Sequence, residues 1–176
     1  DKTVQLTGNI EYNYNVANSG NIADSTVNLN LSDANSFWTG NAVLSNGGAS
    51  DSSSDTVAGL NLNLSNGGTW NVANSTTPTT SESGASTTPL AINNLSLNDG
   101  TVNFTDASQS AKIENLSGTG GQVNAAVEKN ADGTYKTSTL SADKVDTSSG
   151  TPTLNMNMVG TNGTTVNSDV ISADEL

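Results

Sequence analysis

The carboxylates are the residues of this sequence best suited to catalytic or metal-binding chemistry, because the chain contains no His, no Cys and no Arg. A Ser-His-Asp or Cys-His triad is therefore excluded, and so is an ordinary zinc or iron–sulfur site. Clustered aspartates can support calcium-assisted elimination or hydrolysis of a polysaccharide. We expect no catalytic, cofactor-binding or metal-binding residues and no enzyme activity, because there is no Arg to serve as base or anchor and the acids are scattered. They lie at Asp33, Asp51, Asp55, Asp99, Asp106 and Glu114.

The charge of the chain excludes further classes of partner. Five Lys against 17 acids give a formal net charge of −12 at pH 7. An acidic surface repels phosphate, so we expect no binding of nucleic acid. No apolar run approaches the length of a membrane span, so we expect no membrane insertion of this chain. The absence of Cys fits the cytosol, or a bacterial surface protein that crosses the periplasm unfolded.

Short segments in which apolar and polar residues alternate predict β-strands. Only 32% of the residues are hydrophobic, so the chain can fold only if these residues line one continuous stripe. The opposite face of each strand carries Asn, Ser or Thr. The segments are 27–31, 60–64, 95–97, 102–104 and 154–158.

The strands repeat with a regular step. A Leu-x-Leu pair, a turn of Asn, Asp or Gly, and then an aromatic residue or Val recur with the first Leu at positions 29, 62 and 95, in steps of 33. A fourth copy follows 21 residues later, at Leu116. Residues 45–56 and 75–88 contain no large apolar side chain, and we interpret them as inserted loops of 12 and 14 residues. Without them the steps become 21 and 19, so the underlying unit has about 20 residues.

A unit of this length cannot bury its own apolar face, and stacking of similar units solves the problem. We therefore predict an all-β fold, a parallel β-helix or solenoid with inserted loops, formed by residues 1–176 as a single domain. An antiparallel β-sandwich is the alternative, since the turns at 66–68 and 98–100 could close hairpins.

The repeat also predicts which side chains face inward. Adjacent residues of a strand point to opposite faces, so one residue of the Phe37–Trp38 pair should be exposed, and these two are the candidate contact residues. The expected core ladder consists of Leu29, Leu31, Leu62, Leu64, Trp70, Leu95, Leu97, Val102, Phe104, Ile113, Leu116 and Val123.

Two runs in the second half, 95–104 and 111–124, contain the pattern Leu-x-Leu-x-x-Gly-x-Val-x-Phe followed by Leu-Ser-Gly-x-Gly-Gly. This pattern resembles the C-terminal, autochaperone portion of pertactin-like passenger domains of classical (type Va) autotransporters. The resemblance is best over about 90–160, and it implies that 90–176 are autochaperone-like coils. It also implies a right-handed parallel β-helix at the bacterial cell surface, exported through the outer membrane by a translocator barrel that is absent from this chain.

We accordingly expect a structural stem of a surface adhesin, which folds by stacking coil on coil and supports adhesion or self-association. No cofactor is expected. Partners would be a second copy of the chain, a host-surface protein or a glycan. Two alternatives stay open: a β-helical module that itself binds a glycan or host protein, and the stalk of an enzymatic passenger, such as a protease, whose catalytic domain lies outside this chain.

Overall fold

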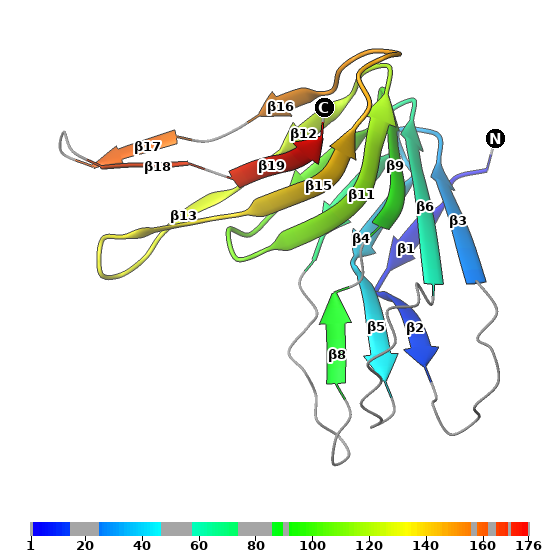
Figure 1. Ribbon diagram of the computed structural model, residues 1–176, viewed down its shortest axis with the longest axis horizontal. Coiled ribbons are helices and arrows are strands. Elements are labelled where there is room, and N and C mark those ends of the chain that lie inside the picture. The colour runs from blue at the N-terminus through cyan, green and yellow to red at the C-terminus, as the bar shows by residue number, and fades with distance from the viewer. Residues whose placement is uncertain are drawn as a thin grey trace.

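The computed structural model is all-β in the residues that it describes, which are 2–14, 25–46, 58–73, 86–89, 92–155, 158–161, 165–168 and 170–175. These residues form strands and turns and contain no helix. The strands lie in two large parallel sheets that face one another, with smaller sheets at one side (Figure 1).

The first large sheet, called sheet A, is parallel throughout. Its strands are short, and each is a single segment in which inward and outward residues alternate. In spatial order they are β1 (Gln5–Thr7), β4 (Phe37–Gly40), β7 (Thr69–Val72), β10 (Thr101–Phe104), β12 (Gln122–Asn124) and β16 (Thr153–Asn155).

The second large sheet, called sheet C, is also parallel throughout and contains longer strands. One passage of the chain through sheets C and A forms a rung, and successive rungs stack. The strands are β3 (Ser25–Leu31), β6 (Ala58–Ser65), β9 (Ile92–Asn98), β11 (Ser110–Gly118), β15 (Thr139–Val145) and β19 (Val170–Glu175).

The remaining strands lie between one passage through sheet A and the next through sheet C. Early in the chain this third side is sheet B, made of β2 (Ile10–Tyr14), β5 (Ala42–Asn46) and β8 (Ser86–Pro89). Later it is two antiparallel hairpins that project from one side of the molecule (Figure 1). The hairpin strands are β13 (Val127–Lys129), β14 (Tyr135–Thr137), β17 (Met158–Thr161) and β18 (Thr165–Ser168).

The register of the sheets follows the steps in the sequence. In sheet C, Leu62 pairs with both Leu29 and Leu95, and Leu95 pairs with Leu116. These are the residues whose spacing is 33, 33 and 21. The prediction of a parallel β-helix is therefore confirmed, and the antiparallel sandwich is wrong, since both facing sheets are parallel.

The steps of the repeat differ in length because the segments on the third side, between sheet A and the next strand of sheet C, differ in length. The 21-residue step passes directly from β10 to β11 through residues 105–109. The predicted loops 45–56 and 75–88 lie mostly outside the described residues. Residues 45–46 end β5 and residues 86–88 belong to β8, so the ends of both segments are strand rather than loop.

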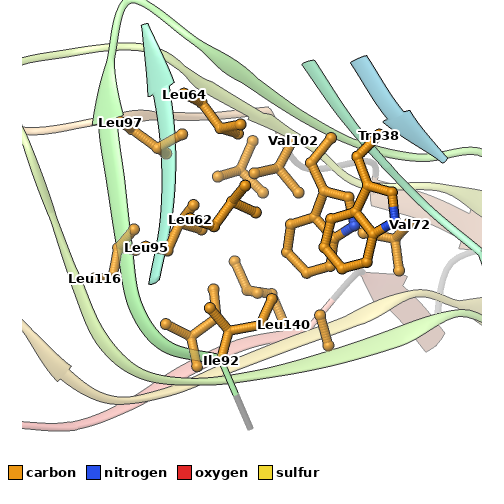
Figure 2. Close-up of a cluster of buried hydrophobic side chains, with 14 of the residues drawn as sticks. Trp38, Leu62, Leu64, Val72, Ile92, Leu95, Leu97, Val102, Leu116 and Leu140 are labelled. Atoms are coloured by element: carbon orange, nitrogen blue, oxygen red, sulfur yellow. The ribbon is translucent and has the colours of Figure 1, made fainter. Parts of the chain in front are cut away.

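Apolar side chains from the two facing sheets meet between them (Figure 2). Trp38 and Trp70, from adjacent rungs, stack with ring centroids 5.4 Å apart and an interplanar angle of 9°. Their indole N–H groups donate to the carbonyls of Gly8 at 2.9 Å and Gly40 at 3.0 Å, so neither ring is buried with an unpaired donor. All twelve residues of the expected ladder are at most 8% exposed.

Close stacking also explains the glycines that precede the strands of sheet A. Thr101 N–H donates to the carbonyl of Gly68 at 2.9 Å, which places Gly68 and Gly100 on top of each other at the same corner. A Cβ on Gly100 would overlap Leu64, and one on Gly68 would overlap the Leu31 carbonyl. A side chain at either position would force adjacent rungs apart.

Leu97 and Leu116 provide a test of the stacked core. Truncation of fully buried Leu97 to Ala should lower the free energy of unfolding by about 3 kcal/mol. Leu97→Asp or Leu116→Asp should prevent folding, because an uncompensated charge would be buried. Urea unfolding followed by circular dichroism measures both effects. Ser96→Asp and Ser117→Asp, on the outward side of the same strands, are the matched controls, and cooperative, wild-type-like unfolding of either Leu→Asp variant would contradict the stacked core.

Candidate functional site

The two candidate contact residues lie on opposite faces of β4. Phe37 points outward and is partly exposed, whereas Trp38 is completely buried against Trp70. Trp38 is therefore corrected from contact candidate to core residue. The stack with Trp70 of the next rung holds the Trp38 ring inside the core, and Phe37 faces the opposite side of the strand. Phe37 alone of the pair is available at the surface.

Phe37 belongs to a regular array on the outer face of sheet A. Because residues alternate along each strand, two positions per strand point outward, and the parallel register aligns them in two rows. None of these outward residues is charged. The first row is Gln5, Phe37, Thr69, Thr101, Gln122 and Thr153, and the second is Thr7, Thr39, Asn71, Asn103, Asn124 and Asn155.

The second row is a continuous amide ladder. Asn71 Nδ2 donates to Thr39 Oγ1 at 3.3 Å, and Asn103 Nδ2 donates to Asn71 Oδ1 at 3.2 Å. The chain continues from Asn124 to Asn103 at 2.6 Å and from Asn155 to Asn124 at 2.7 Å. Each amide therefore holds its neighbour in one rotamer. The remaining hydrogen-bonding positions of these side-chain amides face solvent. They repeat along the row at the strand spacing of about 4.8 Å.

Sheet C carries a shorter ladder of the same kind. Asn61 Nδ2 donates to Asn28 Oδ1 at 2.9 Å, and Asn94 Nδ2 donates to Asn61 Oδ1 at 2.7 Å. At the next rung Asn115 instead donates to the backbone carbonyl of Asn93 at 3.1 Å. The ladder therefore ends between two strands that both carry a kink.

The kink is an extra residue between two inward positions of the strand. In β9 the inward residues Ile92 and Leu95 are three apart rather than two, and the same spacing recurs at Ile113 and Leu116 of β11. Strand β6 lacks the extra residue, so Leu60 N–H bonds to the side-chain oxygen of Asn93 at 3.0 Å instead of to a strand carbonyl. The equivalent residues of the three kinked strands form a column of Asn93, Glu114 and Asp143.

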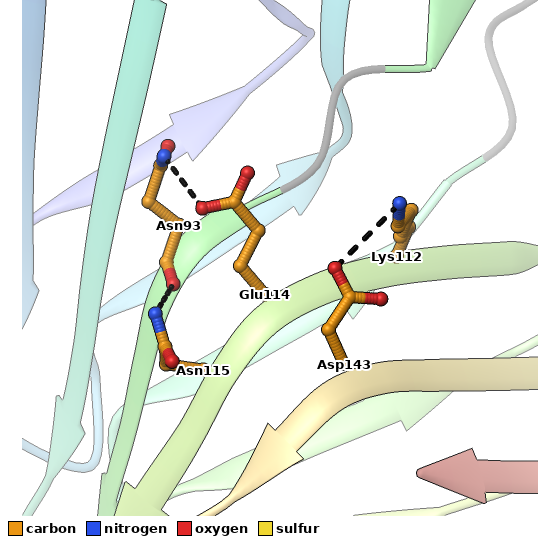
Figure 3. A network of polar contacts seen from close by, with 5 residues as sticks. All are labelled: Asn93, Lys112, Glu114, Asn115 and Asp143. Atoms are coloured by element: carbon orange, nitrogen blue, oxygen red, sulfur yellow. Dashed lines mark hydrogen bonds and ion pairs between the residues drawn. The ribbon is translucent and has the colours of Figure 1, made fainter. Parts of the chain in front are cut away.

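Polar contacts link this column across rungs (Figure 3). Asn93 Nδ2 donates to Glu114 Oε2 at 2.9 Å, which joins β9 to β11. Lys112 Nζ lies 3.7 Å from Asp143 Oδ2, joining β11 to β15, with both side chains about half exposed. A surface ion pair of this kind contributes little stability, so the Asn93–Glu114 contact is the stronger link.

Aspartates occupy the corners between strands rather than one site. Asp33 accepts hydrogen bonds from the Ser36 hydroxyl at 2.6 Å and from the Asn35 N–H at 2.9 Å. These bonds favour the charged form, so the pKa of Asp33 lies below its usual 3.8. Hydroxyl and backbone N–H donors two residues onward lower the pKa of three further carboxylates in the same way, at Asp106, Asp132 and Asp146.

The acids singled out from the sequence are not brought together. Asp33 and Asp106 lie in different turns, and Asp99 adopts φ 69° in the turn before Gly100. Asp51 and Asp55 lie outside the described residues. Within the described ranges, no group of three or more His, Cys, Asp or Glu is placed to hold a metal ion. No helix long and apolar enough to cross a membrane occurs in that same part of the chain.

Sequence reasoning identified the Asn-rich faces but missed the kink column. Its signal is present in the sequence as a change from i, i+2 to i, i+3 spacing of apolar residues at Ile92–Leu95 and Ile113–Leu116. Comparison with known proteins adds no identification: no family model matches the sequence, and neither a curated protein nor a solved structure matches it significantly.

The amide ladder predicts a graded response to truncation. Asn103→Ala removes one ladder bond to each neighbouring rung and should lower the free energy of unfolding by about 1–2 kcal/mol. Asn155→Ala, at the end of the same row, removes a bond of 2.7 Å to Asn124 and a longer one of 3.4 Å to Gln122, both on a single neighbouring rung, and should cost less than Asn103→Ala. Urea unfolding measures both. An equal or smaller loss for Asn103→Ala would show that the ladder does not stabilise the stack.

The four corner aspartates predict a loss of stability in acid. A carboxylate whose pKa is lower in the folded than in the unfolded state stabilises the fold above the unfolded-state pKa, and this contribution disappears as the pH falls through the folded pKa. The unfolding midpoint in urea should therefore be steady from about pH 7 to 5 and fall below about pH 4. Replacement of all four by Asn should reduce that fall, and an unchanged acid dependence would rule out the turns as its source. The four are Asp33, Asp106, Asp132 and Asp146.

Proposed function

We propose that this chain is a stem segment of a bacterial autotransporter passenger, exported through the outer membrane to the cell surface. There it folds by stacking one rung on the next and supports adhesion or self-association. Three features support the proposal: the parallel solenoid, the sequence pattern over 95–124, and the absence of Cys, which suits a chain that crosses an oxidising periplasm unfolded.

The observation that carries the proposal is the residue-by-residue register between rungs. Each rung presents its neighbour with an apolar column, as in Leu62–Leu95–Leu116, and with a polar column, as in Asn71–Asn103–Asn124. A folded rung thus offers the next segment unpaired backbone groups, an apolar stripe and oriented amides. This is the property required of a stem that assembles outside the cell without ATP or added chaperones.

The rungs of the C-terminal half that contain β9, β10 and β11 are the best candidates for the template. Strands β9, β10 and β11 follow one another with short connections, so bringing them together costs less loop entropy than closing the longer steps of the N-terminal half. Strands β9 and β11 also share the kink, with its cross-rung contact between Asn93 and Glu114. In an exported chain, early folding of these rungs would hold the emerged part outside while the rest stacks on it.

Folding order provides the test. Leu31, Leu64, Leu97 and Leu116 are buried in successive strands of sheet C, so each can be truncated to Ala in the full chain. We expect Leu97→Ala and Leu116→Ala to slow folding, with φ-values of about 0.5 or more, and Leu31→Ala mainly to speed unfolding, with a φ-value of about 0.2 or less. Stopped-flow refolding and unfolding in urea measure these rates.

The outcome separates two models. Uniform φ-values across the four positions would indicate that the solenoid folds without a preferred end, and high values at Leu31 and Leu64 would place the template in the N-terminal half. Either result would contradict an autochaperone role for the C-terminal rungs. Each variant needs an equilibrium destabilisation above about 0.6 kcal/mol for the φ-value to be interpreted, and buried Leu→Ala changes exceed this.

A further inference from the structure

The outer face of sheet A is a regular, uncharged surface that the stacking of rungs leaves open. Its two rows cross the strands of the sheet from β1 to β16, and no residue of either row carries a charge. Every residue of the two rows is partly or fully exposed. In a chain with a net charge of −12, an uncharged face of this extent restricts the chemistry of a partner.

The amides of the second row have fixed orientations and spare hydrogen-bonding capacity. Asn103 donates one N–H to Asn71 at 3.2 Å and accepts one from Asn124 at 2.6 Å. A side-chain amide has two N–H donors and an oxygen with two lone pairs. Each amide inside the ladder therefore retains one donor and one acceptor, and the bonds between amides polarise them in the same direction. A hydroxyl group, which both donates and accepts, is the matching partner.

The first row adds hydroxyls and an aromatic ring. Thr69 and Thr101 are neighbours along this row, and Phe37 lies beside Thr69 on the adjacent rung. Phe37 is partly exposed and is the aromatic side chain of the two rows, so its ring offers an apolar platform for the C–H face of a sugar. The two rows are two residues apart along each strand, about 6.6 Å. A sugar ring lying over the array would therefore contact both rows.

We propose that the outer face of sheet A binds an extended, uncharged polysaccharide of the β-1,4-linked type, which lies along the two rows and crosses the strands. Neighbouring strands are about 4.8 Å apart, and one ring of an extended β-1,4-linked chain advances by a similar distance. Successive rings then meet successive strands, with hydroxyls on the amides and one ring stacked on Phe37. The inference rests on the proposed function, because it names the partner through which this segment supports adhesion.

Charge and hydrogen bonding favour this partner over other extended polymers. A chain of net charge −12 repels a polyanion and a second copy of itself, and the rows contain neither a cation nor a carboxylate for an ion pair. An extended peptide adds to a sheet at an edge, whereas the inner strands of sheet A already bond to a neighbour on each side. A neutral polymer of hydroxyl groups meets none of these obstacles.

The test is isothermal titration calorimetry of the full chain with cellobiose, cellotetraose and cellohexaose. Titration at two temperatures ensures that a heat near zero at one of them does not hide binding. Affinity should rise with each increase in length, because the rows cross six strands. The Kd should change less than about twofold between low and high salt, since no ion pair is involved. Maltohexaose has the same number of rings but a curved chain, and should bind about tenfold more weakly.

Two variants locate the site. Phe37→Ala removes the stacking platform and should weaken the binding of cellohexaose about tenfold. Thr101→Lys places a long charged side chain in the middle of the first row and should abolish binding. Ser117→Lys, on the outer face of sheet C, is the matched control and should bind as the wild type does. Circular dichroism checks that the variants fold, and exposed Gln122→Lys, next along the row, replaces Thr101→Lys if that variant is unfolded.

Four results would overturn the proposal. Absence of binding to cellohexaose at about 1 mM by a folded wild-type chain is the first. Binding that survives in Thr101→Lys would place the sugar elsewhere, and equal affinity for maltohexaose would contradict the match of rings to strands. Dimerisation that Thr101→Lys abolishes, without sugar binding, would assign this face to a second copy. A failure of the stem proposal is distinguishable, because it appears in the folding rates of the Leu→Ala variants and not in the titration.

Discussion

The structure depends on parallel, in-register stacking of rungs that cannot bury their apolar residues alone. A single passage through sheets C and A contributes only a few large side chains, for example Leu95, Leu97 and Val102. The rungs before and after it complete the burial, and they also satisfy its backbone hydrogen bonds. Register is therefore specified by every column at once, since a slip of one residue would turn the apolar set outward.

The unusual composition follows from that constraint. Outward positions repeat at the strand spacing, so a row of like charges would repel along the whole stack, whereas a row of amides can bond from one rung to the next. This accounts for the Asn rows through Asn61 and Asn103 and for the uncharged outer face of sheet A. Most of the charged residues in the part of the chain that the structure describes instead lie at corners, in the hairpin of β13 and β14 and beside the kink, with Glu11 on β2 as an exception.

Stacking has no intrinsic stopping point, and this is consistent with the proposed stem function. Every folded rung is a template for the next one. Long connections are tolerated because the two hairpins project away from the facing sheets (Figure 1).

The sequence by itself determined the periodicity and the inward columns, and it favoured a solenoid over a sandwich, because steps of 33, 33 and 21 align Leu29, Leu62, Leu95 and Leu116 when the units stack. Tertiary structure decided the rest. Alternation requires Phe37 and Trp38 to face opposite ways, but which one is buried depends on the stack with Trp70. Likewise, the extra residue of β9 and β11 is visible in the sequence as an i, i+3 spacing, but the contact that it allows between Asn93 and Glu114 depends on the pairing of the two strands.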